Sequence, residues 1–309
     1  MLKLAHIVNP VIVKESSDLF VAQPITFATM KTAQDYAQSQ GIEVKLYSAQ
    51  FPEDYGIIPP FFIRTPDLDR STLDLKNFKI KRKLPLIGDI LDRLYKLSEA
   101  DYYIYTNVDI AVLPNFYVTI AELINQGYDA FIINRRTISN KYKTIEELPL
   151  MYSELGNKHP GLDCFIFPRK SYENYQFNQT FIGSIPIGYT IAINMLCNAN
   201  NFNIFKNLHL TFHIGRDGFW KKDNLKDYEI FNIEETDKII NYYLSKNNLS
   251  ESELITKYLA TIYRGKTNDS VGKIDKIKRR ILLEIAYKKK GLSTRLKELS
   301  RQIDDSIKI

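Results

Sequence analysis

The sequence predicts an α/β protein, a mostly parallel sheet flanked by helices and followed by a helical C-terminal extension. Segments with strand-like and helix-like patterns alternate as far as residue 220, and only helix-like segments follow. The 309 residues are 44% hydrophobic and 25% charged, which is ordinary for a globular protein and sufficient for one large domain. We therefore divide the chain into residues 1–220 and residues 221–309.

The first elements predict a βαβ unit. Residues 2–8 form an apolar strand, and residues 24–40 form a helix with proline at its first position and glycine after its last. Residues 42–47 alternate apolar and polar side chains, as a strand does. Because such units cross over in a right-handed sense, the two strands are expected to pair in parallel.

The remaining elements follow from periodicity and from glycine and proline breaks. Residues 52–80 lack a period and are expected to form a long surface loop that can contain short elements. A helix with one apolar side at 85–100 leads to a buried strand at 102–105. The later predictions are helices at 116–126, 187–198, 233–246 and 251–264 and strands at 130–134 and 163–167.

The segment after the strand at 102–105 is the most informative in the chain. Asn107 and Asp109 stand at alternate positions and are expected to point to the same side of the sheet's carboxyl edge, where open α/β sheets bind ligands. A carboxylate and an amide oxygen suit Mg²⁺ or Mn²⁺. Alternatively, Asp109 caps the turn that follows.

This segment resembles the short acidic motif of the GT-A nucleotide-sugar glycosyltransferases, in which Asp-X-Asp or a variant follows an apolar strand. Asn107-Val108-Asp109 is such a variant, with Asn in the first position. The resemblance implies a GT-A-like, Rossmann-like fold over residues 1–220. It also implies a Mn²⁺ or Mg²⁺ ion held by Asp109 and Asn107, and a nucleotide-diphosphate sugar as donor. Asp109 would then serve the catalytic step through the ion.

A second segment, residues 210–220, extends the resemblance. In many GT-A enzymes a histidine near the end of the catalytic domain completes the metal site, and His213 stands in the matching place. Imidazole is a suitable ligand for Mn²⁺. Arg216 can bind a diphosphate through two hydrogen bonds. A structural role for His213 is the open alternative.

Asp163 precedes the predicted strand at 163–167 and follows His159-Pro160-Gly161. A carboxylate at this place, expected opposite the metal edge, can contact acceptor hydroxyls or stabilise the positive charge that develops on a transferred sugar. We therefore predict Asp163 as a catalytic residue. The alternative is an aspartate that stabilises the turn before the strand.

Five further residues lie where GT-A folds approach the nucleotide. The loop after the first strand contains Asn9 and Pro10. Arg82 and Lys83 can meet phosphate, and Asp89 can hydrogen-bond a ribose or a base edge. The alternative for these three charged residues is a solvated position near the start of a helix.

Positive charge is concentrated in the C-terminal tail. Residues 272–309 contain 12 Lys or Arg and 5 Asp or Glu, whereas residues 1–271 contain 30 and 31. An apolar stripe at helical spacing accompanies these charges, so the tail suits an anionic membrane surface. Alternatively, it packs on the domain or on a second subunit of a homo-oligomer. Because the body is balanced in charge, we expect no nucleic-acid partner.

The location and function are expected as follows. No apolar stretch approaches the roughly 18 to 20 residues of a membrane span, and no signal peptide is indicated, so we expect a cytoplasmic protein, with the inner face of the membrane as an alternative. The expected activity is sugar transfer from a nucleotide-diphosphate donor to a glycan or lipid-linked acceptor in surface polysaccharide synthesis. The alternatives are a catalytically silent binding module and a nucleotidyltransferase, although the latter normally shows a glycine-rich basic segment after the first strand.

Overall fold

The computed structural model describes residues 1–215, 225–246, 254–255 and 258. The chain divides into two compact units, residues 1–236 and residues 237–309. The domain boundary predicted after residue 220 falls in a segment outside the described residues and stays a prediction. All strands among the described residues lie in the first unit.

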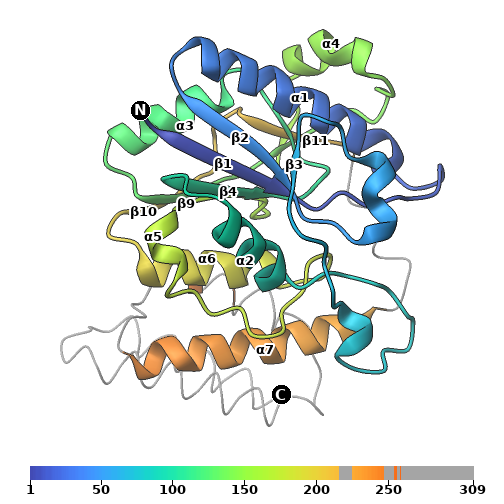
Figure 1. Ribbon diagram of the computed structural model, residues 1–309, viewed down its shortest axis with the longest axis vertical. Coiled ribbons are helices and arrows are strands. Elements are labelled where there is room, and N and C mark those ends of the chain that lie inside the picture. The colour runs from blue at the N-terminus through green and yellow to red at the C-terminus, as the bar shows by residue number, and fades with distance from the viewer. Residues whose placement is uncertain (216–224, 247–253, 256–257, 259–309) are drawn as a thin grey trace, which may run out of the picture. The chain divides into compact units, whose positions relative to one another are not determined.

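A seven-stranded mixed sheet forms the centre of this unit (Figure 1). In spatial order its strands are β10 (Phe202–Phe205), β6 (Ala130–Ile133), β9 (Cys164–Pro168), β4 (Tyr102–Thr106), β1 (Lys3–Val8), β2 (Glu43–Ser48) and β3 (Ile63–Arg64). Only β9 runs antiparallel to its neighbours within this sheet, and the other pairs are parallel. The predicted α/β architecture with a mostly parallel sheet is therefore confirmed.

Helices cover both faces of the sheet. One face carries α1 (Leu19–Ser39) and α3 (Phe116–Asn125), and the other carries α2 (Ile87–Leu97), α5 (Arg169–Tyr172) and α6 (Ile187–Asn198) (Figure 1). The remaining helical segments are η1 (Pro52–Ile57), η2 (Thr72–Asp74), η3 (Ile145–Glu147), α4 (Leu148–Ser153) and α7 (Lys226–Ser245).

A second, smaller sheet is joined to the first by four direct connections of the described chain. Its strands are β5 (Ala111–Val112), β11 (Thr211–Ile214), β7 (Arg136–Ile138) and β8 (Asn157–Lys158), in that spatial order. The connections are β4–β5, β6–β7, β8–β9 and β10–β11. The chain passes from β4 to β5 through a turn, and it passes from β6 to β7 through Asn134 and Arg135. These strands were not predicted from the sequence, because elements of two to four residues carry no readable period.

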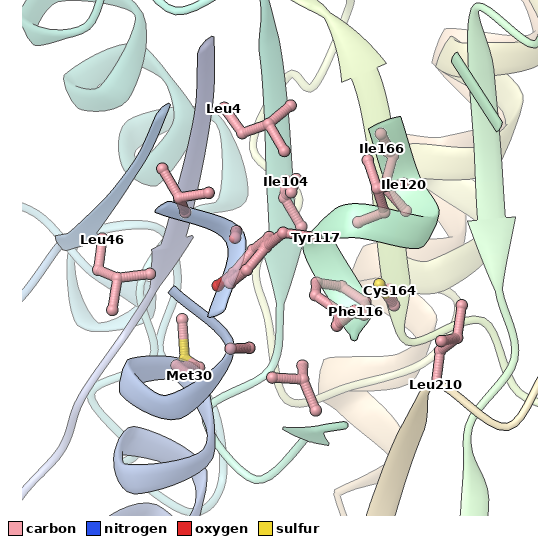
Figure 2. Packing of buried hydrophobic residues seen from close by; sticks show 14 of the residues in the cluster. Leu4, Met30, Leu46, Ile104, Phe116, Tyr117, Ile120, Cys164, Ile166 and Leu210 are labelled. Carbon is pink, nitrogen blue, oxygen red and sulfur yellow. The ribbon is translucent and has the colours of Figure 1, made fainter. Parts of the chain in front are cut away.

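The main core lies between the large sheet and the helices α1 and α3. Its buried side chains are mostly Leu, Ile, Val, Phe and Tyr, and burial of each large one stabilises the fold by about 1.5 to 3 kcal/mol. Figure 2 shows this packing, with labels on Leu4, Met30, Leu46, Ile104, Phe116, Tyr117, Ile120, Cys164, Ile166 and Leu210.

Two helix boundaries differ from the prediction. The helix predicted to start at Pro24 begins at Leu19, where the Asp18 carboxylate accepts a hydrogen bond from the first amide, and Pro24 lies inside α1. Buried contacts along the helix outweigh the bond that proline cannot make. Helix α7 begins at Lys226, earlier than residue 233. Most of the helix predicted at 251–264 lies outside the described residues.

Candidate functional site

Several polar residues gather at the carboxyl edge of the main sheet. β1, β2, β4 and β6 all end at this edge, and β9 starts there because it is reversed. Asn9 follows β1, Asn107 follows β4, Arg135 follows β6, and Asp163 precedes β9. The strand order therefore brings together residues that are far apart in the sequence. The prediction that Asp163 lies opposite the metal edge is wrong, because β9 is reversed and starts at the edge where β4 ends.

Asp109 and His213 meet because the small sheet joins distant segments. After β4 the chain turns, with the Ile110 amide donating to the Asn107 carbonyl oxygen at 3.1 Å, and enters β5. Strand β5 pairs antiparallel with β11, and this pairing places His213 beside Asp109. The distance from Nε2 of His213 to Oδ2 of Asp109 is 3.3 Å.

The electrostatics of this pair favour opposite charges. Burial favours the neutral imidazole of His213, but the hydrogen bond and charge of Asp109 outweigh it and raise the pKa of His213. Burial likewise opposes ionisation of Asp109, but His213, assisted by the charge of Arg135, lowers the pKa of that carboxyl. Each group therefore stabilises the charged form of the other, and positive charge is favoured beside the Asp109 carboxylate.

The chemistry of the Asp109–His213 pair fits a divalent cation. Oδ1 of Asp109 is enclosed and has no hydrogen-bond partner in the part of the chain that the structure describes. Nδ1 of His213 lies 2.9 Å from the Gly215 carbonyl oxygen, which can only accept, so Nε2 is the nitrogen available to a metal. Among the described residues no three His, Cys, Asp or Glu side chains cluster for metal binding. Water and substrate oxygens would have to supply the other ligands.

Asn107 is placed differently from the prediction. Strand β4 ends at Thr106, so Asn107 and Asp109 belong to a turn and are not alternate residues of a strand. The side-chain oxygen of Asn107 accepts a hydrogen bond from the Tyr105 hydroxyl at 3.2 Å. This oxygen has a second lone pair, so a metal-ligand role for Asn107 stays a prediction.

Asp163 lies beside a buried arginine that the sequence analysis did not single out. Oδ2 of Asp163 is 3.6 Å from Nε of Arg135 and 3.5 Å from Nδ1 of His159. Arg135 is only 4% exposed. The available signal in the sequence was a pair of arginines directly after the apolar strand β6, where a solvated charge is the usual interpretation.

The predicted nucleotide contacts lie in several places. Asn9 donates from Nδ2 to the Ala49 carbonyl oxygen at 2.7 Å and so ties the end of β1 to the end of β2. Pro10 is buried next to it. Lys83 is paired with Glu53, and its ammonium lies 4.0 Å from the centre of the Phe51 ring.

The loop between Arg82 and α2 is anchored by polar contacts. The Arg82 amide donates to the Tyr228 hydroxyl at 3.0 Å. Asp89, in the first turn of α2, accepts two hydrogen bonds at 2.7 Å from Nε and Nη2 of Arg70. Arg70, which the sequence analysis did not identify, is about half exposed and fixed by this contact. Arg216 lies outside the described residues, as does the tail at 272–309.

Comparison with known proteins finds similarity in structure alone. No protein-family model matches this sequence, and no curated protein matches it. Similar solved structures include S. aureus TarS residues 1–349 in complex with UDP-GlcNAc, at 10% identity and a TM-score of 0.52, covering 92% of this chain and 82% of that chain. The complex of the same protein with UDP also has 10% identity and a TM-score of 0.52, covering 92% and 81%.

These likenesses concern the fold. The mixed sheet flanked by helices is the GT-A-type α/β fold that the resemblance of the sequence implied, and the predicted fold is therefore confirmed. Within the described part of the chain, no helix is long and apolar enough to span a membrane.

Proposed function

We propose that this chain transfers a sugar from a nucleotide-diphosphate donor to a glycan or lipid-linked acceptor. The observation that carries the proposal is the Asp109–His213 pair, with its enclosed and unpartnered carboxylate oxygen, at the carboxyl edge of the sheet. The shared fold with a protein crystallised with UDP-GlcNAc supports a nucleotide sugar as donor. Together these observations favour an enzyme over a structural protein.

The residues at the edge have distinct roles in this proposal. Asp109 and His213 hold a divalent cation, with Asn107 as a further ligand. When bound, the cation neutralises charge on the departing diphosphate. Asp163 faces the reacting sugar and stabilises the positive charge that develops on it, or orients the acceptor hydroxyl. Asn9 fixes the chain between β1 and β2, where the nucleotide is expected to lie.

A donor screen tests the proposal. The full-length chain is incubated with a panel of nucleotide sugars, with and without Mn²⁺, and release of free nucleoside diphosphate is measured. We expect release from one class of donor, dependent on Mn²⁺ and reduced to background in Asp109→Asn. Binding of a nucleotide sugar without release would favour a catalytically silent binding module, and the absence of both would reject the proposal.

A further inference from the structure

We propose that Arg135 is a positioning residue of the transfer step, whose guanidinium fixes the Asp163 carboxylate and compensates its charge beside the Asp109–His213 pair. This inference rests on the proposed function. It concerns a residue that neither the sequence nor the fold comparison marks, and it predicts a kinetic defect in a variant that leaves the donor-binding residues unchanged.

Arg135 is buried at the carboxyl edge of the sheet. The residue stands where the chain leaves β6 and enters β7, at the edge shared with Asp109 and Asp163. A guanidinium with only 4% exposure requires a compensating charge, and Nε lies 3.6 Å from Oδ2 of Asp163. The Arg135 carbonyl oxygen also accepts the His159 amide at 3.2 Å. Arg135 therefore holds the segment before β9 through its backbone and its side chain.

The segment that carries Asp163 has little room to move. A Cβ on Gly161 would lie 2.5 Å from Cε1 of His159 and 3.2 Å from Oδ2 of Asp163. A Cβ on Gly188, in the first turn of α6, would lie 2.8 Å from the Leu162 carbonyl oxygen. Only glycine permits these close approaches. The segment is therefore packed tightly against itself at Gly161 and against α6 at Gly188. The Asp163 carboxylate is thus confined between this packing and the Arg135 guanidinium.

Arg135 is also the buried cation beside Asp163 at this edge. Without Arg135, Asp109 and Asp163 would stand at one buried edge with less positive charge to compensate them. The Asp163 side chain would then be free to shift, and a displacement of about 1 Å can cost roughly 100-fold in rate.

The test compares Arg135→Met, Asp163→Asn and the double variant in the full-length chain, with kcat, donor KM and Tm as readouts. We expect each single variant to lower kcat about 100-fold with donor KM within about threefold of wild type. The double variant should lose little more, because residues that act as a unit are not additive. Arg135→Lys, which keeps the charge, should recover at least about tenfold in kcat.

Arg136→Met is the matched control. Arg136 is the adjacent buried arginine, but its guanidinium donates to the carbonyl oxygens of Leu155 and Gly156, so its loss should lower Tm and leave kcat near wild type. If Arg135→Met does not fold, Arg135→Lys and Asp163→Asn decide. A loss of kcat in Arg135→Lys that is smaller than the loss in Asp163→Asn then supports the inference, and a wild-type kcat in either variant overturns it.

Two other outcomes would also overturn the role proposed for Arg135. A rise in donor KM without a fall in kcat would make Arg135 a donor-binding residue, and losses that multiply in the double variant would separate it from Asp163. Failure of the proposed function would give a different result. A wild-type chain that releases no nucleoside diphosphate from any donor would contradict sugar transfer itself. An active wild type with an equally active Arg135→Met contradicts only the role of Arg135.

Discussion

Two buried histidines, His6 in the core and His213 at the sheet edge, are 0% and 2% exposed but differ in their surroundings. Nδ1 and Nε2 of His6 each lie 2.9 Å from a hydroxyl, that of Tyr117 and that of Thr106, and burial lowers the pKa of His6 to about 3. His213 faces the Asp109 carboxylate, which raises its pKa in spite of the burial.

The difference teaches that burial alone does not separate a structural polar residue from a functional one. Around His6, the fold supplies a partner for both ring nitrogens. At the carboxyl edge, Oδ1 of Asp109 and Oδ1 of Asn134 are enclosed and have no hydrogen bond to any residue that the structure describes. Oδ2 of Asp163 likewise has no hydrogen bond there, but it has ionic contacts with Arg135 and His159. Because an enclosed polar atom without a partner costs about 1 to 3 kcal/mol, a ligand is the natural partner for the edge.

The largest effect is expected from a change of Asp109 at the carboxyl edge. Asp109→Asn should reduce transfer by at least about 1,000-fold, because the amide is a weak cation ligand and lacks the negative charge that the ion requires. The Tm should change by only a few degrees, since the side chain contributes little to the core. Turnover and calorimetry with Mn²⁺ and a nucleoside diphosphate measure both effects. Wild-type affinity in the variant would remove Asp109 from the site.

The core histidine should show the opposite pattern. Because the pKa of His6 is lowered to about 3 in the folded chain, the unfolded chain binds an extra proton below about pH 6.5. Neutral His6 therefore makes its full contribution to the free energy of unfolding above about pH 6.5. This contribution is lost as the pH falls towards 3. His6→Gln should cost about 2 kcal/mol at pH 7 and keep the kcat of the folded fraction.

Denaturant unfolding at pH 7, 6 and 5 measures this contribution. The difference in unfolding free energy between wild type and His6→Gln should shrink by up to about 1.4 kcal/mol for each pH unit below 6.5. A difference that stays constant with pH would show that His6 is not held neutral by its burial.

A smaller effect is expected from His213, the second residue of the Asp109–His213 pair. Only a neutral imidazole can bind a metal, and Asp109 raises the pKa of His213, so Mn²⁺-dependent binding should strengthen as the pH rises from about 5.5 to 7.5. His213→Ala should weaken that binding about 10- to 100-fold and flatten its pH dependence. Calorimetry across this range measures both, and a variant with an unchanged pH profile would return His213 to a structural role.

The smallest effect is expected from Asp89, whose carboxylate is hydrogen-bonded to Arg70 of the same chain. Both oxygens of Asp89 accept hydrogen bonds from Arg70, so by the same comparison Asp89 should behave like His6 and not like Asp109. We expect Asp89→Asn to lower stability by about 1 kcal/mol and to leave donor affinity within about twofold. A tenfold loss of donor affinity at constant Tm would instead support the predicted ribose contact.

Most of the fold was readable from the sequence because the long elements carry clear periods. The strands β1, β2, β4, β6 and β9 and the helices α2, α3 and α6 were all anticipated within a few residues. The errors arose where local signals conflict with tertiary contacts. Pro24 resembles the start of a helix, but it lies inside α1, whose packed face stabilises the turns before it.

The sequence by itself determined the candidates Asp109 and Asp163, because an acidic residue beside an apolar strand is visible without any knowledge of strand order. The resemblance to GT-A enzymes added His213 to the predicted metal site of Asp109. Only the tertiary structure decided that they share one edge with Arg135, because short strands such as β5 and β11 have no local signature and pair through contacts between distant residues. Long-range pairing therefore decides which polar atoms gain a partner within the protein and which remain for a ligand.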